Sequence, residues 1–192
     1  MIKRIRKFLL MDNHLCPPVW YPTMDAEIRK YIHNPERIFA PYIKAGDTVA
    51  DIGCGSGFFS VKIAGMVGET GKVVACDIQE SGLDMLRRKI DGSPLERYIS
   101  VHQSTIHSIG LTAKFDFILN FWMFHEVDDK ENFMTEIHAM MKPESFYMIV
   151  EPRFHVPRKA FEKEVEIALK AGLKPVDRPK IWMSRSVVFM LQ

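Results

Sequence analysis

The sequence has few cysteines, no long apolar run and almost no net charge. Its 192 residues include three cysteines, too few and too widely spaced for a disulfide framework or a paired zinc-ligand pattern. No stretch approaches the roughly 18 continuous apolar residues that a membrane-spanning helix needs. Lysine and arginine number 26 against 24 acidic residues, so a net charge of +2 provides no broad basic face for a nucleic-acid backbone. We therefore expect no metal, no transmembrane segment and no nucleic-acid partner.

The first residues are basic and then briefly apolar, as a signal peptide is. The apolar run at residues 8–11 stops at Asp12, however, far short of the roughly 7 to 15 residues of a signal-peptide core. We therefore expect a cytoplasmic protein, which suits the odd number of cysteines. The basic N-terminus favours either a partner-binding or membrane-surface helix or a solvated chain end. The oligomeric state stays open.

Length and composition favour one globular domain. Hydrophobic residues make up 47% of the sequence, and a chain of this size buries roughly two-thirds of its unfolded surface. We assign residues 1–40 to an N-terminal lid or cap segment and residues 41–192 to the main domain. Prolines beside Trp20 and Tyr21 suit either a lid over a ligand or a brace on a sheet.

From residue 48 onward, short apolar runs alternate with amphipathic stretches. Strands are predicted at residues 48–52, 72–78, 98–102, 115–121 and 145–151, with helices in most of the intervals. Pro143 is expected to end one helix and Pro157 to open the next, with Leu169 on its inward face. This order predicts a doubly wound, Rossmann-like α/β fold with a mainly parallel seven-stranded sheet. The runs at 174–177 and 186–191 leave no room for a crossover helix, so they predict an antiparallel C-terminal hairpin.

A glycine-rich loop follows the first predicted strand directly. Gly53, Gly55 and Gly57 alternate, which permits positive φ and lets a ligand approach the main chain without meeting Cβ atoms. A dinucleotide fingerprint would have a third glycine where Phe58 stands, and Asp51 before the loop would repel a diphosphate. The loop therefore favours a ligand that has a positive group and no phosphate.

A second carboxylate, Asp77, ends the second predicted strand. In doubly wound sheets a ligand lies beyond the carboxyl ends of the strands, beside the first strand, so Asp77 can bind both hydroxyls of a ribose there. An adenosine that carries an amine or a sulfonium suits both acids. Each acid also has a structural alternative, because Asp51 can cap the amides of the loop and Asp77 can be a turn residue.

The loop, the acid after the second strand and the terminal hairpin, in this order, resemble the class I S-adenosylmethionine-dependent methyltransferases. The resemblance covers residues 43–191. Within this class, the sequence is similar to the small-molecule enzymes of the ubiquinone and menaquinone biosynthesis group. It implies S-adenosylmethionine as cofactor, S-adenosylhomocysteine as product and no metal. Carried over position by position, it implies these cofactor-binding residues: Asp51, Gly53, Cys54, Gly55, Gly57, Asp77, Ile78, Ser104 and Asn120.

The resemblance also implies how these residues share the cofactor. The glycines would contact its methionine part, with Asp51 near the amino group, Asp77 on the ribose and Ile78 on the adenine face. The family often places an aspartate on the adenine amine, where this sequence has Ser104. A serine oxygen can accept a hydrogen bond there, and we expect a weaker contact than an aspartate would make.

The segments after the fourth and fifth strands contain candidates for the chemistry. Methyl transfer from a sulfonium is an in-line displacement, so a base is needed only where the acceptor must lose a proton. His125, with Glu126 beside it, is the candidate base, and loop packing is its structural alternative. Arg153 could contact a polar or anionic substrate, or it could pair with Glu151.

We therefore expect a cytoplasmic methyltransferase that transfers a methyl group from S-adenosylmethionine to a small molecule. Three alternatives stay open. A non-catalytic regulatory module could keep the nucleotide pocket, and a nicotinamide enzyme is disfavoured by Phe58. An arsenite methyltransferase would need convergent thiolates, whereas Cys16 is the one cysteine outside the predicted core elements. The acceptor atom stays open between carbon, oxygen, nitrogen and sulfur.

Overall fold

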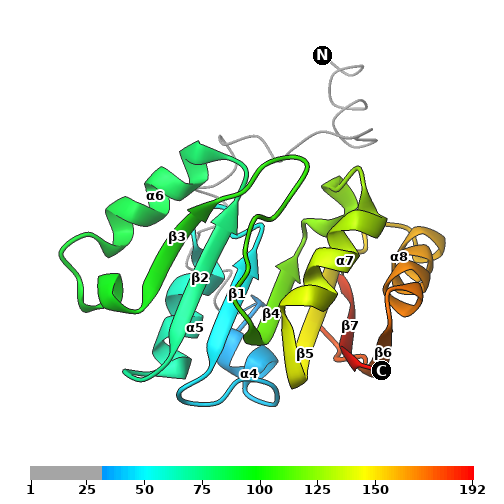
Figure 1. Ribbon diagram of the computed structural model, residues 1–192, viewed down its shortest axis with the longest axis horizontal. Helices are drawn as coiled ribbons and strands as arrows, with labels where there is room; N and C mark the ends of the chain where they lie inside the picture. The colour runs from blue at the N-terminus through cyan, green and yellow to red at the C-terminus, as the bar shows by residue number, and fades with distance from the viewer. Residues whose placement is uncertain (1–31) are drawn as a thin grey trace.

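Seven strands form one sheet in the computed structural model, which describes residues 32–192 (Figure 1). The strands are β1 (Thr48–Ile52), β2 (Lys72–Asp77), β3 (Ile99–Gln103), β4 (Phe115–Phe121), β5 (Met141–Pro152), β6 (Leu173–Asp177) and β7 (Ser184–Leu191). Their order is β3-β2-β1-β4-β5-β7-β6. All pairs from β3 to β5 are parallel, and β7 runs antiparallel to both β5 and β6. The predicted doubly wound fold and its C-terminal hairpin are confirmed.

Helices cover both faces of the sheet (Figure 1). The helices are α4 (Pro35–Phe39), α5 (Phe58–Val67), α6 (Glu80–Ile90), α7 (Lys130–Met140) and α8 (Arg158–Lys170), with short 3-10 turns η2 (Pro94–Arg97) and η3 (Phe124–Glu126). The first three helices share one apolar core cluster, and α7 and α8 share the other. Residues 104–114, between β3 and β4, form a loop without a helix. Within residues 32–192, no helix is long and apolar enough to cross a membrane.

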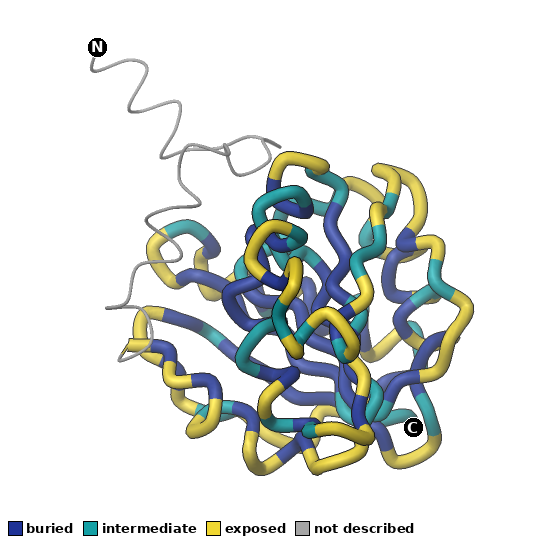
Figure 2. Tube along the Cα trace, turned by 90° about the vertical axis from the view of Figure 1, so that its left-hand side faces the viewer, coloured by how far each residue is buried: buried dark blue, intermediate teal, exposed yellow. Residues whose placement is uncertain are grey.

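Aromatic side chains fill the core beneath α4 and α5. The Phe39 ring lies 5.4 Å from that of Phe59 and 5.9 Å from that of Phe117 (centroid to centroid). Figure 2 shows the buried strands inside a more exposed shell. Because Phe39 is fully buried, α4 packs on the sheet although its sequence position is in the expected cap. Residues 1–31 of the predicted lid or cap at residues 1–40 lie outside the described residues.

Two sequence expectations are wrong in detail. The helix α7 ends at Met140, and β5 begins at the next residue, so Pro143 lies inside the strand rather than before it. The pairing with β4 shifts its register there, and a bulge accommodates a proline because its residues need not donate to the ladder. On α8, Leu169 is 42% exposed, whereas Glu164 is buried in the inward stripe with Phe161 and Val165.

Candidate functional site

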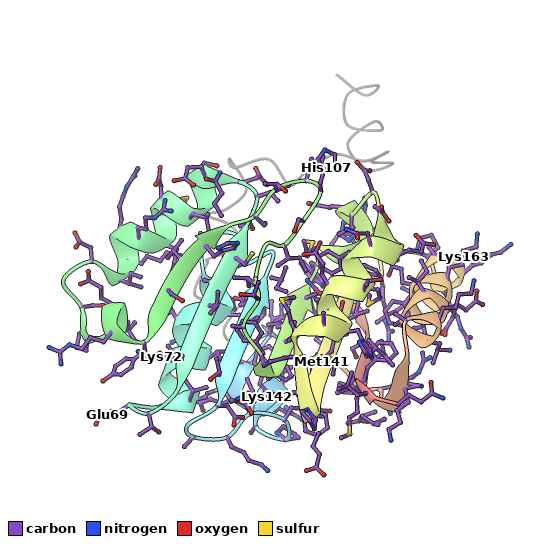
Figure 3. All side chains as sticks on the ribbon, viewed as in Figure 1. Glu69, Lys72, His107, Met141, Lys142 and Lys163 are labelled. Carbon is purple, nitrogen blue, oxygen red and sulfur yellow. The ribbon has the colours of Figure 1, made fainter. Side chains whose placement is uncertain are left out.

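A cavity of about 260 Å³ lies at the carboxyl edge of the sheet, where the chain leaves β1, β2 and β4. The order of the strands reverses between β1 and β4, so the loops that follow them diverge and leave a crevice. His107, labelled in Figure 3, belongs to the cavity wall and marks this edge. The wall includes most of the predicted cofactor-binding residues: Asp51, Gly53, Cys54, Gly55, Asp77, Ile78 and Ser104.

The glycine loop lies between two close neighbours. Gly53 has a φ of 80°, and a Cβ atom there would lie 2.4 Å from Cγ of Met123, which follows β4. Gly57 has a φ of 81° and precedes α5, where a Cβ would lie 2.4 Å from Cδ1 of Leu86 on α6. Both positions therefore need glycine for backbone conformation and for close packing. Gly57 is not among the residues of the cavity wall, and it lies on the side of the loop that packs against α6.

The two predicted carboxylates are buried and oriented by their own neighbours. Asp51 is 2% exposed and accepts a 2.6 Å hydrogen bond from the Ser60 hydroxyl. Asp77 is 8% exposed and accepts hydrogen bonds of 2.8 Å from the backbone amides of Gly55 and Gln79. Burial raises the pKa of Asp77, while the amide hydrogen bonds act in the opposite direction. The site thus presents two carboxylates of fixed orientation.

The loop after β3 forms another wall of the cavity. Hydrogen bonds hold this loop to Glu136, a residue that the sequence did not indicate. Glu136 on α7 accepts hydrogen bonds from the Ser108 hydroxyl (3.1 Å) and from the amides of Ile109 (2.8 Å) and Gly110 (3.3 Å). Ser104, at the start of this loop, donates its amide to the Asp77 carbonyl at 3.0 Å. The loop that follows the expected adenine contact is therefore held at its first residue and at residues 108–110.

Asn120 serves the sheet rather than the wall of the cavity. It is fully buried at the end of β4 and is not among the lining residues. Its side-chain amide donates to the Ile52 carbonyl at 2.8 Å, and its oxygen accepts from the Tyr147 hydroxyl at 2.7 Å. Both sides of the amide thus have partners from neighbouring strands.

His125, the predicted candidate base, lies just behind the cavity in a pair with Glu151. Its Nδ1 is 2.5 Å from Oε2 of Glu151, and its backbone amide donates to Oε1 at 3.1 Å. Burial lowers the pKa of His125 to about 4 and raises the pKa of Glu151 to about 8, because burial disfavours both charged forms.

The predicted alternative of a Glu151–Arg153 pair is wrong, since Arg153 instead donates through Nε to the Ser184 carbonyl at 2.7 Å.

The segment between β4 and α7 completes the wall of the cavity. Trp122 has a φ of 60°, and its indole nitrogen donates to the Ser184 hydroxyl at 2.9 Å. Glu126 also lines the cavity, and its side chain is 12% exposed. Asp129 lines it too, and its carboxylate accepts a hydrogen bond from the Asn132 amide and so caps the start of α7. Trp122 gave no sequence signal because its strained backbone depends on contacts distant in the chain.

The charges of the wall fit a cationic cofactor. Among the described lining residues none is lysine or arginine, whereas Asp51 and Asp77 stand beside the glycine loop. These carboxylates would attract an amino group and a sulfonium and would repel a diphosphate. In residues 32–192, no group of three or more His, Cys, Asp or Glu side chains is arranged to hold a metal ion.

The family comparison agrees with this geometry. A family described as "Methyltransferase domain" matches residues 43–182, which include the glycine loop, Asp77 and the segment after β4. A crystal structure of a SAM-dependent methyltransferase from Aquifex aeolicus is 26% identical. The alignment covers 93% of this chain and 100% of that one, with a TM-score of 0.82.

Curated relatives are similar over part of their length. A demethylmenaquinone methyltransferase from Symbiobacterium thermophilum is 26% identical over 79% of this chain and 65% of its own length. Another from Lactobacillus johnsonii is 30% identical over 57% of this chain and 45% of its own length. The chain thus spans about half to two-thirds of the length of these relatives.

Proposed function

The chain belongs to the methyltransferase-domain family, among the class I S-adenosylmethionine-dependent methyltransferases, and on this premise we propose that it transfers a methyl group from S-adenosylmethionine to a small-molecule acceptor. The observation that carries the proposal is the cavity at the carboxyl edge, where two buried carboxylates flank a glycine loop and no described lining residue is lysine or arginine.

The described residues support a division of labour along the cavity. In this proposal Asp51, whose carboxylate accepts the Ser60 hydroxyl, receives the amino group of the cofactor, and Asp77 receives the ribose hydroxyls; both line the cavity. Ile78 and the loop that begins at Ser104 offer the adenine surface. When bound, S-adenosylmethionine supplies an electrophilic methyl group on a positively charged sulfur. The chain's own contribution is to hold the reactants in line and to exclude water.

A small acceptor agrees with the size of the molecule. The fold of residues 48–191 is a single sheet and its covering helices, without an inserted domain between them. The acceptor therefore meets the segment after β4, where Trp122 and Met123 provide an apolar surface. The demethylmenaquinone methyltransferases among the relatives also support a small acceptor.

The free thiols of Cys54 and Cys76 agree with the reducing cytoplasm.

Calorimetry on the full chain tests the proposal. We expect S-adenosylhomocysteine to bind at micromolar concentration and reduced nicotinamide dinucleotide not to bind, because Asp51 and Asp77 oppose phosphates. The absence of S-adenosylhomocysteine binding at millimolar concentration would overturn the proposal. Binding together with no methyl transfer from labelled S-adenosylmethionine to any member of a broad acceptor panel would favour the regulatory module instead.

A further inference from the structure

Three side chains form a line from the interior of the protein to the cavity. Glu151 on β5 is fully buried, and His125 at η3 contacts it through Nδ1 at 2.5 Å. The other ring nitrogen of His125, Nε2, lies 4.0 Å from Oε1 of Glu126, which lines the cavity. A buried acid, an imidazole and a cavity-facing carboxylate therefore follow one another.

The protonation state of the His125–Glu151 pair determines which form of the imidazole faces Glu126. Because burial lowers the pKa of His125 and raises that of Glu151, the pair at neutral pH shares one proton between Nδ1 and Oε2. A neutral imidazole then carries its own proton on Nε2, on the side of Glu126. His155, whose ring lies 4.7 Å from that of His125, and Lys130 also face this pair. After burial, which lowers the pKa of His125, the Glu126 carboxylate raises it and the Lys130 ammonium lowers it.

The charge of the cavity indicates what could approach Glu126. Six described lining residues are acidic: Asp51, Asp77, Glu126, Asp128, Asp129 and Glu136. Two of them stand beside the glycine loop, and Glu136 holds the loop after β3. Two lysines lie behind this wall, where Lys130 donates to the Val127 carbonyl at 2.6 Å and Lys89 to the Ser56 carbonyl at 2.7 Å, but neither lines the cavity. Lys72 and Lys142, labelled in Figure 3 at the starts of β2 and β5, lie at the opposite edge of the sheet. An anionic acceptor would meet repulsion here, whereas a cation would be attracted.

We propose that the acceptor is a protonated amine, that Glu126 binds it and takes its proton, and that His125, held by Glu151, is a positioning residue for Glu126. This inference rests on the proposed methyl transfer. Trp122 and Phe121, which also line the cavity, suit an amine with an apolar or aromatic body.

The reaction balances without a further reactant. One ammonium proton moves to a carboxylate oxygen of Glu126, which leaves a lone pair on the nitrogen. This pair forms the N–C bond to the methyl carbon while the C–S bond breaks and its electrons stay on sulfur. The products are a methylated ammonium, neutral S-adenosylhomocysteine and a protonated Glu126, which returns its proton to water. General-base steps of this kind contribute roughly 10²- to 10⁴-fold.

A panel of shape-matched acceptors tests the chemical class. The full chain is assayed with labelled S-adenosylmethionine and with phenethylamine, 2-phenylethanol and phenylacetate, together with aliphatic and indole-bearing sets built in the same way. We expect kcat/KM for an amine to exceed that of its alcohol and carboxylate partners at least tenfold. Preference for the alcohol or the carboxylate, or cofactor binding without methylation of any amine, would overturn the amine proposal. A chain that fails to bind the cofactor would overturn the proposed function as well.

Variants test the roles of the individual residues. Glu126→Gln should lower kcat for the best amine about 100-fold and leave the affinity for S-adenosylhomocysteine within twofold, while Glu131→Gln, at an exposed position of α7, should change neither. His125→Asn should lower kcat about tenfold, and the double variant should be no slower than Glu126→Gln alone. Additive losses in the double variant, or an unchanged kcat in Glu126→Gln, would overturn the assignment, and the thermal midpoints of the variants confirm that they fold.

Discussion

The two walls of the cavity are built differently. On the side of β1 and β2, Asp77 accepts hydrogen bonds from the amide of Gln79, two residues after it, and from the amide of Gly55 in the glycine loop, 22 residues before it. On the side of β4 and β5, the hydrogen bonds join distant parts of the chain. Glu151 and His125 are 26 residues apart in the sequence, and Trp122 and Ser184 are 62 residues apart. The first wall is thus built between two segments whose motifs the sequence displays, the glycine loop and the acid that ends β2, and the second depends on contacts that no such motif indicates.

The largest expected effect comes where the two walls touch. Gly53→Ala would place a Cβ atom 2.4 Å from Cγ of Met123 at a φ of 80°. Left-handed strain and overpacking together should lower the free energy of unfolding by about 2 to 5 kcal/mol. Urea unfolding measures the loss, and cofactor affinity should fall with it.

Gly92→Ala is the matched control, because Gly92 has a φ of 65° and no atom within 4 Å of the added Cβ. It should cost about 1 to 2 kcal/mol from backbone strain alone. Truncation of Met123 to alanine in the Gly53→Ala background should recover part of the difference. Equal losses at the two glycines would show that the walls are not in close contact at Gly53.

The next effect concerns the first wall alone. Asp77→Asn should weaken binding of S-adenosylhomocysteine by about 1.5 to 3 kcal/mol, because a charged acceptor for the ribose hydroxyls is lost. Calorimetry measures the change against Asp91→Asn, at an exposed position after α6. An unchanged affinity would remove Asp77 from the cofactor site.

The third effect belongs to the second wall and depends on pH. Burial raises the pKa values of Glu151 and Glu164 from 4.5 to about 8, so between pH 7 and 8.5 the folded chain keeps protons that the unfolded chain has released. The free energy of unfolding should therefore fall as pH rises through this window, by about 1 kcal/mol for each carboxyl group. His125 has a folded pKa of about 4 and contributes little there, because its ring is neutral in both states above pH 7.

Glu151→Gln should remove the share of this pH dependence that comes from Glu151. Urea unfolding at pH 7 and 8.5 measures it, with Glu131→Gln as the exposed control. Lys130, Tyr147 and Glu164 also act on the pair electrostatically, so the isosteric glutamine is preferable to a truncation. A slope as steep as that of the unmodified chain would mean that Glu151 is ionised in the folded protein.

The smallest effect should lie outside both walls. Arg178 pairs with Glu162 at 3.1 Å on the surface, with side-chain exposures of 49% and 40%. Arg178→Gln should change stability by less than about 0.5 kcal/mol, because solvent screens exposed ion pairs. Cofactor binding and methyl transfer should not change. A loss similar to that of Asp77→Asn would contradict the separation of the surface from the site.

The same contrast explains what could be predicted from the sequence. The doubly wound fold, the hairpin and the residue types of the first wall follow from patterns in the sequence, such as the alternating glycines and the acid that ends β2. The partners of Glu151 and Glu136 lie 26 or more residues away, so no local pattern indicates them. Pro143 in a bulge and the buried Glu164 on α8 run against the residue preferences on which sequence reasoning depends.

The most direct test of the central claim is a crystal structure of the chain with S-adenosylhomocysteine. The cavity at the carboxyl edge should contain the ligand, with its ribose hydroxyls within hydrogen-bonding distance of the Asp77 carboxylate and its amino group near Asp51. The position from which the methyl group departs should face Trp122 and Glu126. A ligand bound elsewhere, or with its ribose away from Asp77, would contradict the account.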